Sequence, residues 1–149
     1  VLTLSGLQHM AADKSITITM DIPETLEALG DLEMVKTIVR NLVSNAIKFS
    51  PEGTQIRVEG RGSGGVASIA VRDQGIGMSP AAMARLFKIG PPNVSKAGTR
   101  GERGTGLGLI LCKELATKNH GDIQVESTLG KGSVFTLILP APASLGPAS

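Results

Sequence analysis

The chain has 149 residues, the length of one domain, and its 41% hydrophobic and 19% charged residues are typical of a folded protein rather than a disordered one. Its net charge of +2 and its lack of Trp and Tyr argue against a general nucleic-acid or membrane binder, and its single cysteine, Cys112, excludes an internal disulfide. The composition is unusual in one respect: 19 glycines, about twice the ordinary proportion of roughly 7%.

The first part of the chain predicts a helix, a strand and a long helix. We expect a short helix over Leu7–Lys14 and a strand over Ser15–Ile22, where β-branched residues alternate with others before Pro23. Asp31 is a natural N-cap for the long helix, which Pro51 ends. Apolar residues at steps of three and four define its buried stripe: Leu32, Val35, Val39, Leu42, Ala46 and Phe49.

The rest of the chain predicts four strands and two helices. The expected strands are Gln55–Glu59 and Val66–Arg72, joined by a Gly60–Gly65 loop, and Asp122–Glu126 and Ser133–Leu139, joined by a turn at 130–132. The expected helices run from the Ser79-Pro80 start to Phe87, and over Leu107–Thr117. Lys88–Arg103 has no periodicity and is predicted to be a functional or mobile loop.

These elements predict an α+β fold, a two-layer sandwich of a mixed, mostly antiparallel sheet packed against helices. We assign residues 1–14 to the end of a linker or an entering helix, 15–140 to the domain, and 141–149 to a disordered tail. Because the chain starts at Val1 rather than Met, we expect it to be a piece of a longer protein. No apolar run reaches the roughly 18 residues of a membrane span.

Polar side chains on the long helix form the first candidate site. Asn41, Asn45 and Lys48 are four and three residues apart and therefore share one face. An Asn carbonyl oxygen is a suitable Mg²⁺ ligand, and Lys neutralises phosphate charge, so this face could hold a metal-bound polyphosphate. On spacing alone, a solvated helix edge remains the alternative.

Two glycine-rich segments form the other candidates. The first is Asp73-Gln-Gly-Ile-Gly-Met78, which directly follows a strand. Its glycines would let the backbone approach a flat ligand, and Asp73 would offer a hydrogen-bond acceptor to an amine. A plain turn is the alternative interpretation. The segment 101–109 opens a helix, whose N–H groups make an anion site. Neither the Walker pattern nor the dinucleotide fingerprint G-x-G-x-x-G fits it.

Taken in order, these segments resemble the ATP-binding catalytic domain of bacterial sensor histidine kinases. That family belongs to a wider group of proteins that also includes DNA gyrase, a heat-shock chaperone and the MutL repair ATPase. The resemblance covers about residues 14–140. The matching motifs are an asparagine box (Asn41–Phe49), a first glycine box (Asp73–Gly77), a phenylalanine box (Leu86–Lys88), a second glycine box (Gly104–Leu109) and a closing hairpin (Gly130–Ser133).

The resemblance implies a Bergerat-type fold that binds ATP and Mg²⁺. It implies that Asp73 accepts a hydrogen bond from the adenine amino group, with Ser133 nearby, and that Asn45 holds Mg²⁺. Asn41 and Lys48 would face the phosphates, and Phe49 would flank the adenine or ribose. The first glycine box would add Gly75, Ile76, Gly77 and Met78 to the nucleotide site, and the second would add Gly104, Thr105, Gly106, Leu107, Gly108 and Leu109. Residues 88–103 would form the ATP lid, from which Arg100 or Arg103 would reach the γ-phosphate.

Asn41 narrows the expected reaction. The ATPases of this group carry Glu at that position as the base for water, whereas an amide cannot accept a proton. The resemblance therefore implies phosphoryl transfer to another acceptor rather than hydrolysis. His9 lacks the helical hairpin that surrounds the family's acceptor histidine and is expected to be a surface residue, and His120 is expected near a helix C-terminus.

The expected partners follow from that reaction. They are ATP or ADP, a histidine-bearing dimerisation domain of the parent kinase and, indirectly, a response regulator, with no nucleic acid. We expect a monomeric, cytoplasmic domain whose homodimeric parent is anchored in the bacterial inner membrane. Two alternatives remain: a nucleotide-binding pseudokinase or interaction module, and a serine kinase of the anti-sigma type.

Overall fold

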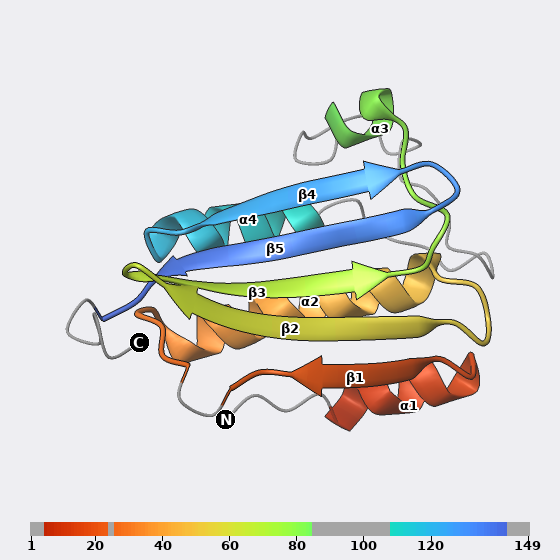
Figure 1. The fold of residues 1–149 in the computed structure, drawn as a ribbon, viewed down its shortest axis with the longest axis horizontal. Helices are drawn as coiled ribbons and strands as arrows, with labels where there is room; N and C mark the ends of the chain where they lie inside the picture. The colour runs from red at the N-terminus through yellow and green to blue at the C-terminus, as the bar shows by residue number, and fades with distance from the viewer. Residues whose placement is uncertain (1–4, 24–25, 85–107, 143–149) are drawn as a thin grey trace.

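The computed structural model describes residues 5–23, 26–84 and 108–142. Within these ranges the strands form one five-stranded sheet in the order β1-β2-β3-β5-β4 (Figure 1). β1 pairs with β2 in parallel, and the other neighbours are antiparallel. The strands are β1 (Thr17–Asp21), β2 (Gln55–Ser63), β3 (Val66–Asp73), β4 (Asp122–Thr128) and β5 (Gly132–Pro140).

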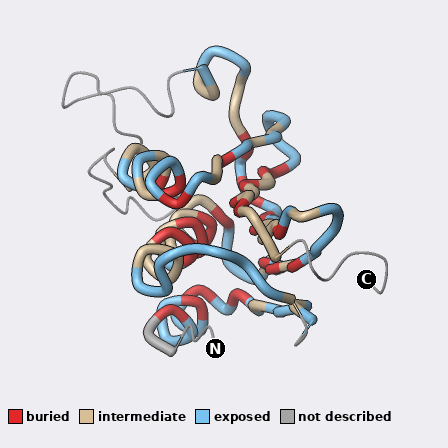
Figure 2. Tube along the Cα trace, turned by 90° about the vertical axis from the view of Figure 1, so that its left-hand side faces the viewer, coloured by how far each residue is buried: buried red, intermediate tan, exposed pale blue. Residues whose placement is uncertain are grey.

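Helices cover one face of this sheet, which confirms the predicted α+β sandwich. The helices of this layer are α1 (Ser5–Asp13), α2 (Leu32–Phe49) and α4 (Gly108–Lys118), while the short helix α3 (Pro80–Ala84) lies apart from it, beyond β4 in Figure 1. Figure 2 shows the buried residues gathered between the helical layer and the sheet. Because one face of each strand turns toward α1, α2 and α4, alternate residues of β2 and β5 are buried and the others are not.

Helix α2 is the centre of the helical layer and begins where the sequence predicts. The Asp31 carboxylate caps it by accepting a hydrogen bond from the Met34 N–H at 2.9 Å. The predicted stripe is wrong at its first position, because Leu32 lies in the first turn and is 60% exposed. The side chains that α2 buries form two adjacent rows: Ile38, Val39, Leu42, Val43, Ala46 and Ile47.

The β2–β3 hairpin differs from the prediction in its loop. Residues 60–63, expected in the loop, belong to β2, and the chain reverses at Gly64 and Gly65, with φ of 58° and 80°. Positive φ at two successive residues is the geometry of a tight hairpin turn. Gly60 packs closely inside the strand: a Cβ there would lie 2.8 Å from the Leu26 side chain and 2.9 Å from the Ile22 side chain, which would have to move to accept it.

The remaining elements agree with their predicted positions as far as the structure describes them. Ser79 caps α3, its Oγ accepting a hydrogen bond from the Ala82 N–H at 3.2 Å. His120 follows α4 with φ of 61°, in the left-handed conformation that ends many helices. The expected lid, the end of the expected third helix and the last seven residues lie outside the described residues.

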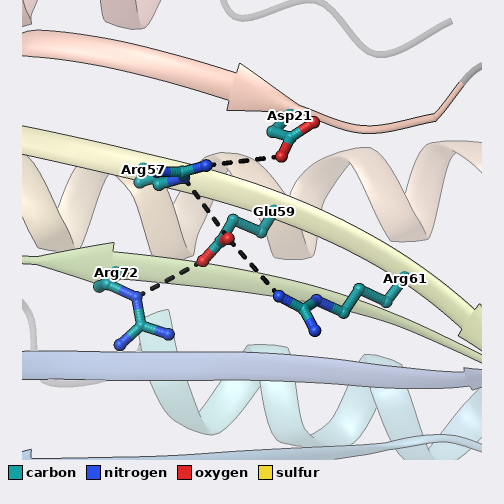
Figure 3. A network of polar contacts seen from close by, with 5 residues as sticks. All are labelled: Asp21, Arg57, Glu59, Arg61 and Arg72. Atoms are coloured by element: carbon teal, nitrogen blue, oxygen red, sulfur yellow. Dashed lines mark hydrogen bonds and ion pairs between the residues drawn. The ribbon is translucent and has the colours of Figure 1, made fainter.

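The sheet face opposite the helices carries a network of charged residues (Figure 3). The Glu59 carboxylate pairs with Arg57 at 3.4 Å, Arg72 at 3.5 Å and Arg61 at 3.9 Å, and Arg57 also pairs with Asp21 at 3.5 Å. The arginine side chains are more than half exposed, while Glu59 is 15% exposed, and ion pairs open to solvent contribute only about 0–1 kcal/mol each. The network therefore makes this face polar, while the free energy of folding comes mainly from the apolar layer behind it.

None of the helices in the described ranges is long and apolar enough to cross a membrane.

The difference between Leu32 and Leu42 can be tested by mutation. We expect Leu42→Ala to lower the free energy of unfolding by about 2–5 kcal/mol, because Leu42 is fully buried in the core. Leu32→Ala, the matched control on the same helix, is expected to cost about 0.5 kcal/mol or less. Urea unfolding followed by circular dichroism measures both, since the chain has no Trp. Equal losses would show that Leu32 is part of the core.

Candidate nucleotide-binding site

The candidate site lies at one edge of the sandwich, where several elements end together. β3 ends at Asp73 and α2 at Phe49, and the β4–β5 turn lies beside them, on the right in Figure 1. The α4 helix, which packs against α2, begins at Gly108. Four of the five predicted motifs, far apart in sequence, therefore have described residues at this edge.

Asp73 is buried, with 7% of its surface exposed. Its Oδ1 accepts hydrogen bonds from the backbone N–H of Gly75 at 2.8 Å and of Ser133 at 3.2 Å. Burial raises the pKa of the Asp73 carboxyl above its ordinary value, and these two hydrogen bonds oppose the rise. Within the described part of the chain, both of these bonds end on Oδ1 rather than on Oδ2.

The loop after Asp73 lies directly against the end of α2. The Ile76 N–H donates to the Phe49 carbonyl oxygen at 3.3 Å. A Cβ on Gly75 would lie 2.5 Å from the same oxygen, so only glycine fits there. Gly77 has φ of 69°, and a Cβ there would collide with the Thr128 carbonyl. The sequence predicts that these glycines let backbone approach a flat ligand, whereas the close neighbours that the structure shows are protein carbonyl groups.

The β4–β5 turn holds the other side of this loop. The Gly130 N–H donates to the Ile76 carbonyl at 2.7 Å, and the Met78 N–H donates to Ser127 Oγ at 2.8 Å. Ser127 Oγ also lies 2.7 Å from Ser133 Oγ. Sequence reasoning missed Ser127. The signal that could have found it is the hairpin register, which places Ser127 opposite Ser133.

The predicted polar face of α2 is half-buried rather than fully solvated. Asn41, Asn45 and Lys48 all have intermediate exposure. Asn41 Nδ2 donates to the Thr37 carbonyl at 2.9 Å, and a Cβ on Gly108 would lie 3.4 Å from Asn41 Oδ1. The amide face therefore meets the first residue of α4.

The aromatic ring at the end of α2 contacts the neighbouring ammonium. Lys48 Nζ lies 5.2 Å from the centroid of the Phe49 ring, within the range of a cation–π interaction.

The structure also places some of the other predicted residues. Gly108 and Leu109 start α4, Ile76 is exposed, and Met78 is partly buried. The predicted residues that lie outside the described ranges are Arg100, Arg103, Gly104, Thr105, Gly106, Leu107 and the phenylalanine box.

The donor set at this edge fits Mg²⁺ better than a transition metal. In the described ranges, no three residues among His, Cys, Asp and Glu are grouped to hold a metal ion. Cys112 lies in the core, where burial raises the pKa of its thiol to about 12, so it offers no thiolate. Amide oxygens on α2 are hard ligands of the kind that Mg²⁺ accepts when phosphate oxygens supply the rest of its shell.

A hollow of about 390 Å³ lies away from these residues. It contains none of the predicted site residues, and its lining combines apolar side chains with the end of α4: Leu29, Gly30, Lys118, Asn119, His120 and Pro140.

Comparison with known proteins decides the family. Residues 30–143 match the family described as "Histidine kinase-, DNA gyrase B-, and HSP90-like ATPase". The chain belongs to this family. Over 132 residues it is 44% identical to the "Sensor-like histidine kinase SenX3" of Mycolicibacterium smegmatis, across 88% of this chain and 34% of that protein. The chain thus spans about a third of the length of this relative, and its likeness within the ATPase family is to sensor histidine kinases.

Solved structures agree with this assignment. "Crystal structure of ShkA full-length in complex with AMPPNP" superposes with a TM-score of 0.76 and 28% identity, covering 92% of this chain and 28% of that one. "Mycobacterial sensor histidine kinase MprB" has a TM-score of 0.74 over 92% of this chain and 91% of that one, and its 24% identity supports the fold alone. The chain is therefore an ATP-binding catalytic domain of the sensor histidine kinase type.

The environment of Asp73 predicts a pH-dependent stability. Because its pKa is raised in the folded state, the folded chain holds more protons than the unfolded chain between about pH 3.9 and the raised pKa. Stability from Asp73 is thus present below that window and is lost as the pH rises through it. Asp73→Asn stays neutral at every pH. Its free energy of unfolding, relative to that of the wild type, should therefore increase as the pH rises through the window. Urea unfolding at several pH values measures this difference, and a difference independent of pH would contradict the buried carboxyl.

Proposed function

We propose that this chain binds Mg²⁺-ATP and donates the γ-phosphoryl group to a histidine on a separate dimerisation domain, as the catalytic domain of a two-component sensor kinase. The observation that carries this proposal is the contact between the amide face of α2 and the start of α4. Asn41 and Gly108 meet there, and a helix N-terminus beside amide and ammonium groups suits a polyphosphate.

The adenine would bind at the Asp73 end of the site. The Oδ2 atom of Asp73 would accept a hydrogen bond from the adenine amino group, while Oδ1 stays bonded to Gly75 and Ser133. Ile76 is exposed beside it and Phe49 is half-buried, so their apolar groups can contact the base or ribose. An acceptor oxygen on a largely buried side chain such as Asp73 favours a ligand that carries an N–H donor over one without it.

The triphosphate would extend along α2 toward α4. Asn45 would hold Mg²⁺ through its amide oxygen, and the ion would neutralise phosphate charge. Lys48 and Asn41 would contact the phosphates from the helix. The predicted lid with Arg100 and Arg103, and the second glycine box, belong to the same proposal and lie outside the described residues.

The amide at Asn41 supports transfer over hydrolysis. Its Nδ2 is bonded to the Thr37 carbonyl, and no proton acceptor of carboxylate type stands at this position. An imidazole nitrogen would attack the γ-phosphorus with its own lone pair, forming the N–P bond as the bond to the β–γ bridging oxygen breaks and ADP leaves. This reaction needs positioning and charge neutralisation more than a base.

The wider setting is also a proposal, supported by the name of the relative as a sensor-like histidine kinase. The parent would be a homodimer anchored in the inner membrane, with this domain in the cytoplasm. The dimerisation domain would carry the acceptor histidine and pass the phosphoryl group to a response regulator. The isolated chain would be a monomer.

Phosphotransfer to a supplied acceptor tests the proposal. The histidine-bearing domain of the parent protein, incubated with this chain and γ-labelled Mg²⁺-ATP, should gain acid-labile, base-stable label. Asn45→Ala should lower the rate at least about tenfold by removing the metal ligand. Ser44→Ala, at the neighbouring position of α2, is the matched control and should retain the rate within about twofold.

Each other outcome points to a different function. ATP binding without any labelled acceptor would indicate a nucleotide-binding module. Acid-stable label on a serine would indicate a kinase of the anti-sigma type. Rapid release of inorganic phosphate by the chain alone would indicate a water-dependent ATPase.

A further inference from the structure

Lys14 is a buried lysine outside the site, between α1 and β1. Only 3% of its surface is exposed. Its Nζ donates hydrogen bonds to the backbone carbonyls of Ile47 at 3.0 Å and Lys48 at 3.2 Å. These carbonyls belong to the last turn of α2, the helix that carries the asparagine box. A charged side chain from the start of the domain therefore reaches the end of this helix.

The chemistry of this contact explains why an ammonium can be buried there. The last carbonyls of a helix lack the usual partners within it and carry the negative end of its dipole. Here the Ile47 carbonyl also accepts a hydrogen bond from the Ser50 N–H at 3.3 Å, so Lys14 adds a second donor to it. An ammonium that donates to two of them regains hydrogen bonds and a favourable charge interaction, which offsets the cost of leaving water. A neutral side chain of the same length would provide neither.

The segment around Lys14 is itself held firmly. The Gly53 N–H donates to the Lys14 carbonyl at 3.1 Å, and the Ile16 N–H donates to the Ala11 carbonyl at 2.8 Å. Ala11 and Leu7 bury the inner face of α1 in the core, and α1 packs against α2. A displacement of α1 would therefore carry Lys14 with it.

The α2 carbonyls bound by Lys14 adjoin the one that positions the nucleotide loop. Lys48 precedes Phe49, whose carbonyl accepts the Ile76 N–H and lies against Gly75. Gly75 in turn donates to the Asp73 carboxylate. Of three consecutive carbonyls at the end of α2, the first two thus accept hydrogen bonds from Lys14, and the third accepts one from the first glycine box.

We propose that Lys14 is a positioning residue that fixes the end of α2 against the first glycine box and so couples the position of α1 to nucleotide affinity. This inference rests on the proposed function, because it concerns the affinity of the same site for Mg²⁺-ATP. Lys14 touches no substrate; it acts through the carbonyls of α2. Coupling energies between linked sites commonly change affinity by about 5-fold or more.

Calorimetric binding of Mg²⁺-ATP to the 149-residue chain tests the coupling. Lys14→Met should weaken binding about tenfold at a temperature where the variant is fully folded. Lys14→Arg, which keeps the charge and donors, should restore affinity to within about threefold of the wild type. Lys118→Met, which removes an exposed lysine from the end of α4, is the matched control and should bind as the wild type does.

Amide hydrogen exchange separates positioning from general stability. Without nucleotide, Lys14→Met should speed exchange at the Ile76 amide more than at amides of the central β3–β5 pair. In the wild type, Mg²⁺-ATP should slow exchange at Gly53 and Ile16, because coupling between sites is reciprocal. This second measurement needs no variant and holds even if Lys14→Met does not fold.

The outcomes distinguish the two proposals. A wild-type chain that does not bind Mg²⁺-ATP overturns the proposed function. Wild-type binding together with unchanged affinity in Lys14→Met overturns the role of Lys14, even if the variant is less stable. Mg²⁺-ATP that protects the Ile76 amide but leaves Gly53 and Ile16 unchanged also overturns it.

Discussion

The close approach of the first glycine box to the end of α2 is the constraint on which the candidate site depends. The Phe49 carbonyl receives the Ile76 N–H, and Gly75 lies so near that a Cβ would be only 2.5 Å from that oxygen. This contact fixes where β3 ends relative to α2. It thereby sets the distance between the buried carboxylate of Asp73 and the amide face of the helix.

The rest of the fold supports that contact from both sides. The β4–β5 turn binds the far side of the loop through Gly130 and Ser127, and the buried lysine at position 14 binds the end of α2. The apolar layer lies behind the site, and the charged network of Glu59 lies on the opposite face of the sheet. Among the described residues, the site is thus built mainly from backbone hydrogen bonds at an edge, with few ionisable groups.

Much of this arrangement could be predicted from the sequence because its signals are local. The cap at Asp31, the period of α2 and the alternation of the strands depend on neighbouring residues, and each is confirmed. The wrong predictions concern residues whose burial or secondary structure depends on tertiary contacts. Leu32 fits the helical period but lies in the exposed first turn of α2, and Gly60 resembles a loop residue but lies in β2, against the side chains of Leu26 and Ile22.

The site itself was predicted in part. The sequence motifs identified Asp73, the first glycine box and the amides of α2 as candidates. The spacing of residues in the sequence could not show that Gly75 and Gly77 pack against protein backbone. Ser127 and Lys14 carry no motif, because their roles arise from strand register and from chain segments more than thirty residues apart. Such contacts need three-dimensional structure.

Chemical-shift mapping of Mg²⁺-ATP on the isotope-labelled chain tests most directly that the nucleotide binds at this edge. The largest shifts should fall on the Gly75 and Ile76 amides, the Asn45 side-chain amide and Gly108, with little change at Arg57 and Arg61. Shifts concentrated instead around Leu29 and His120, or on the charged face of the sheet, would contradict the assignment of the site.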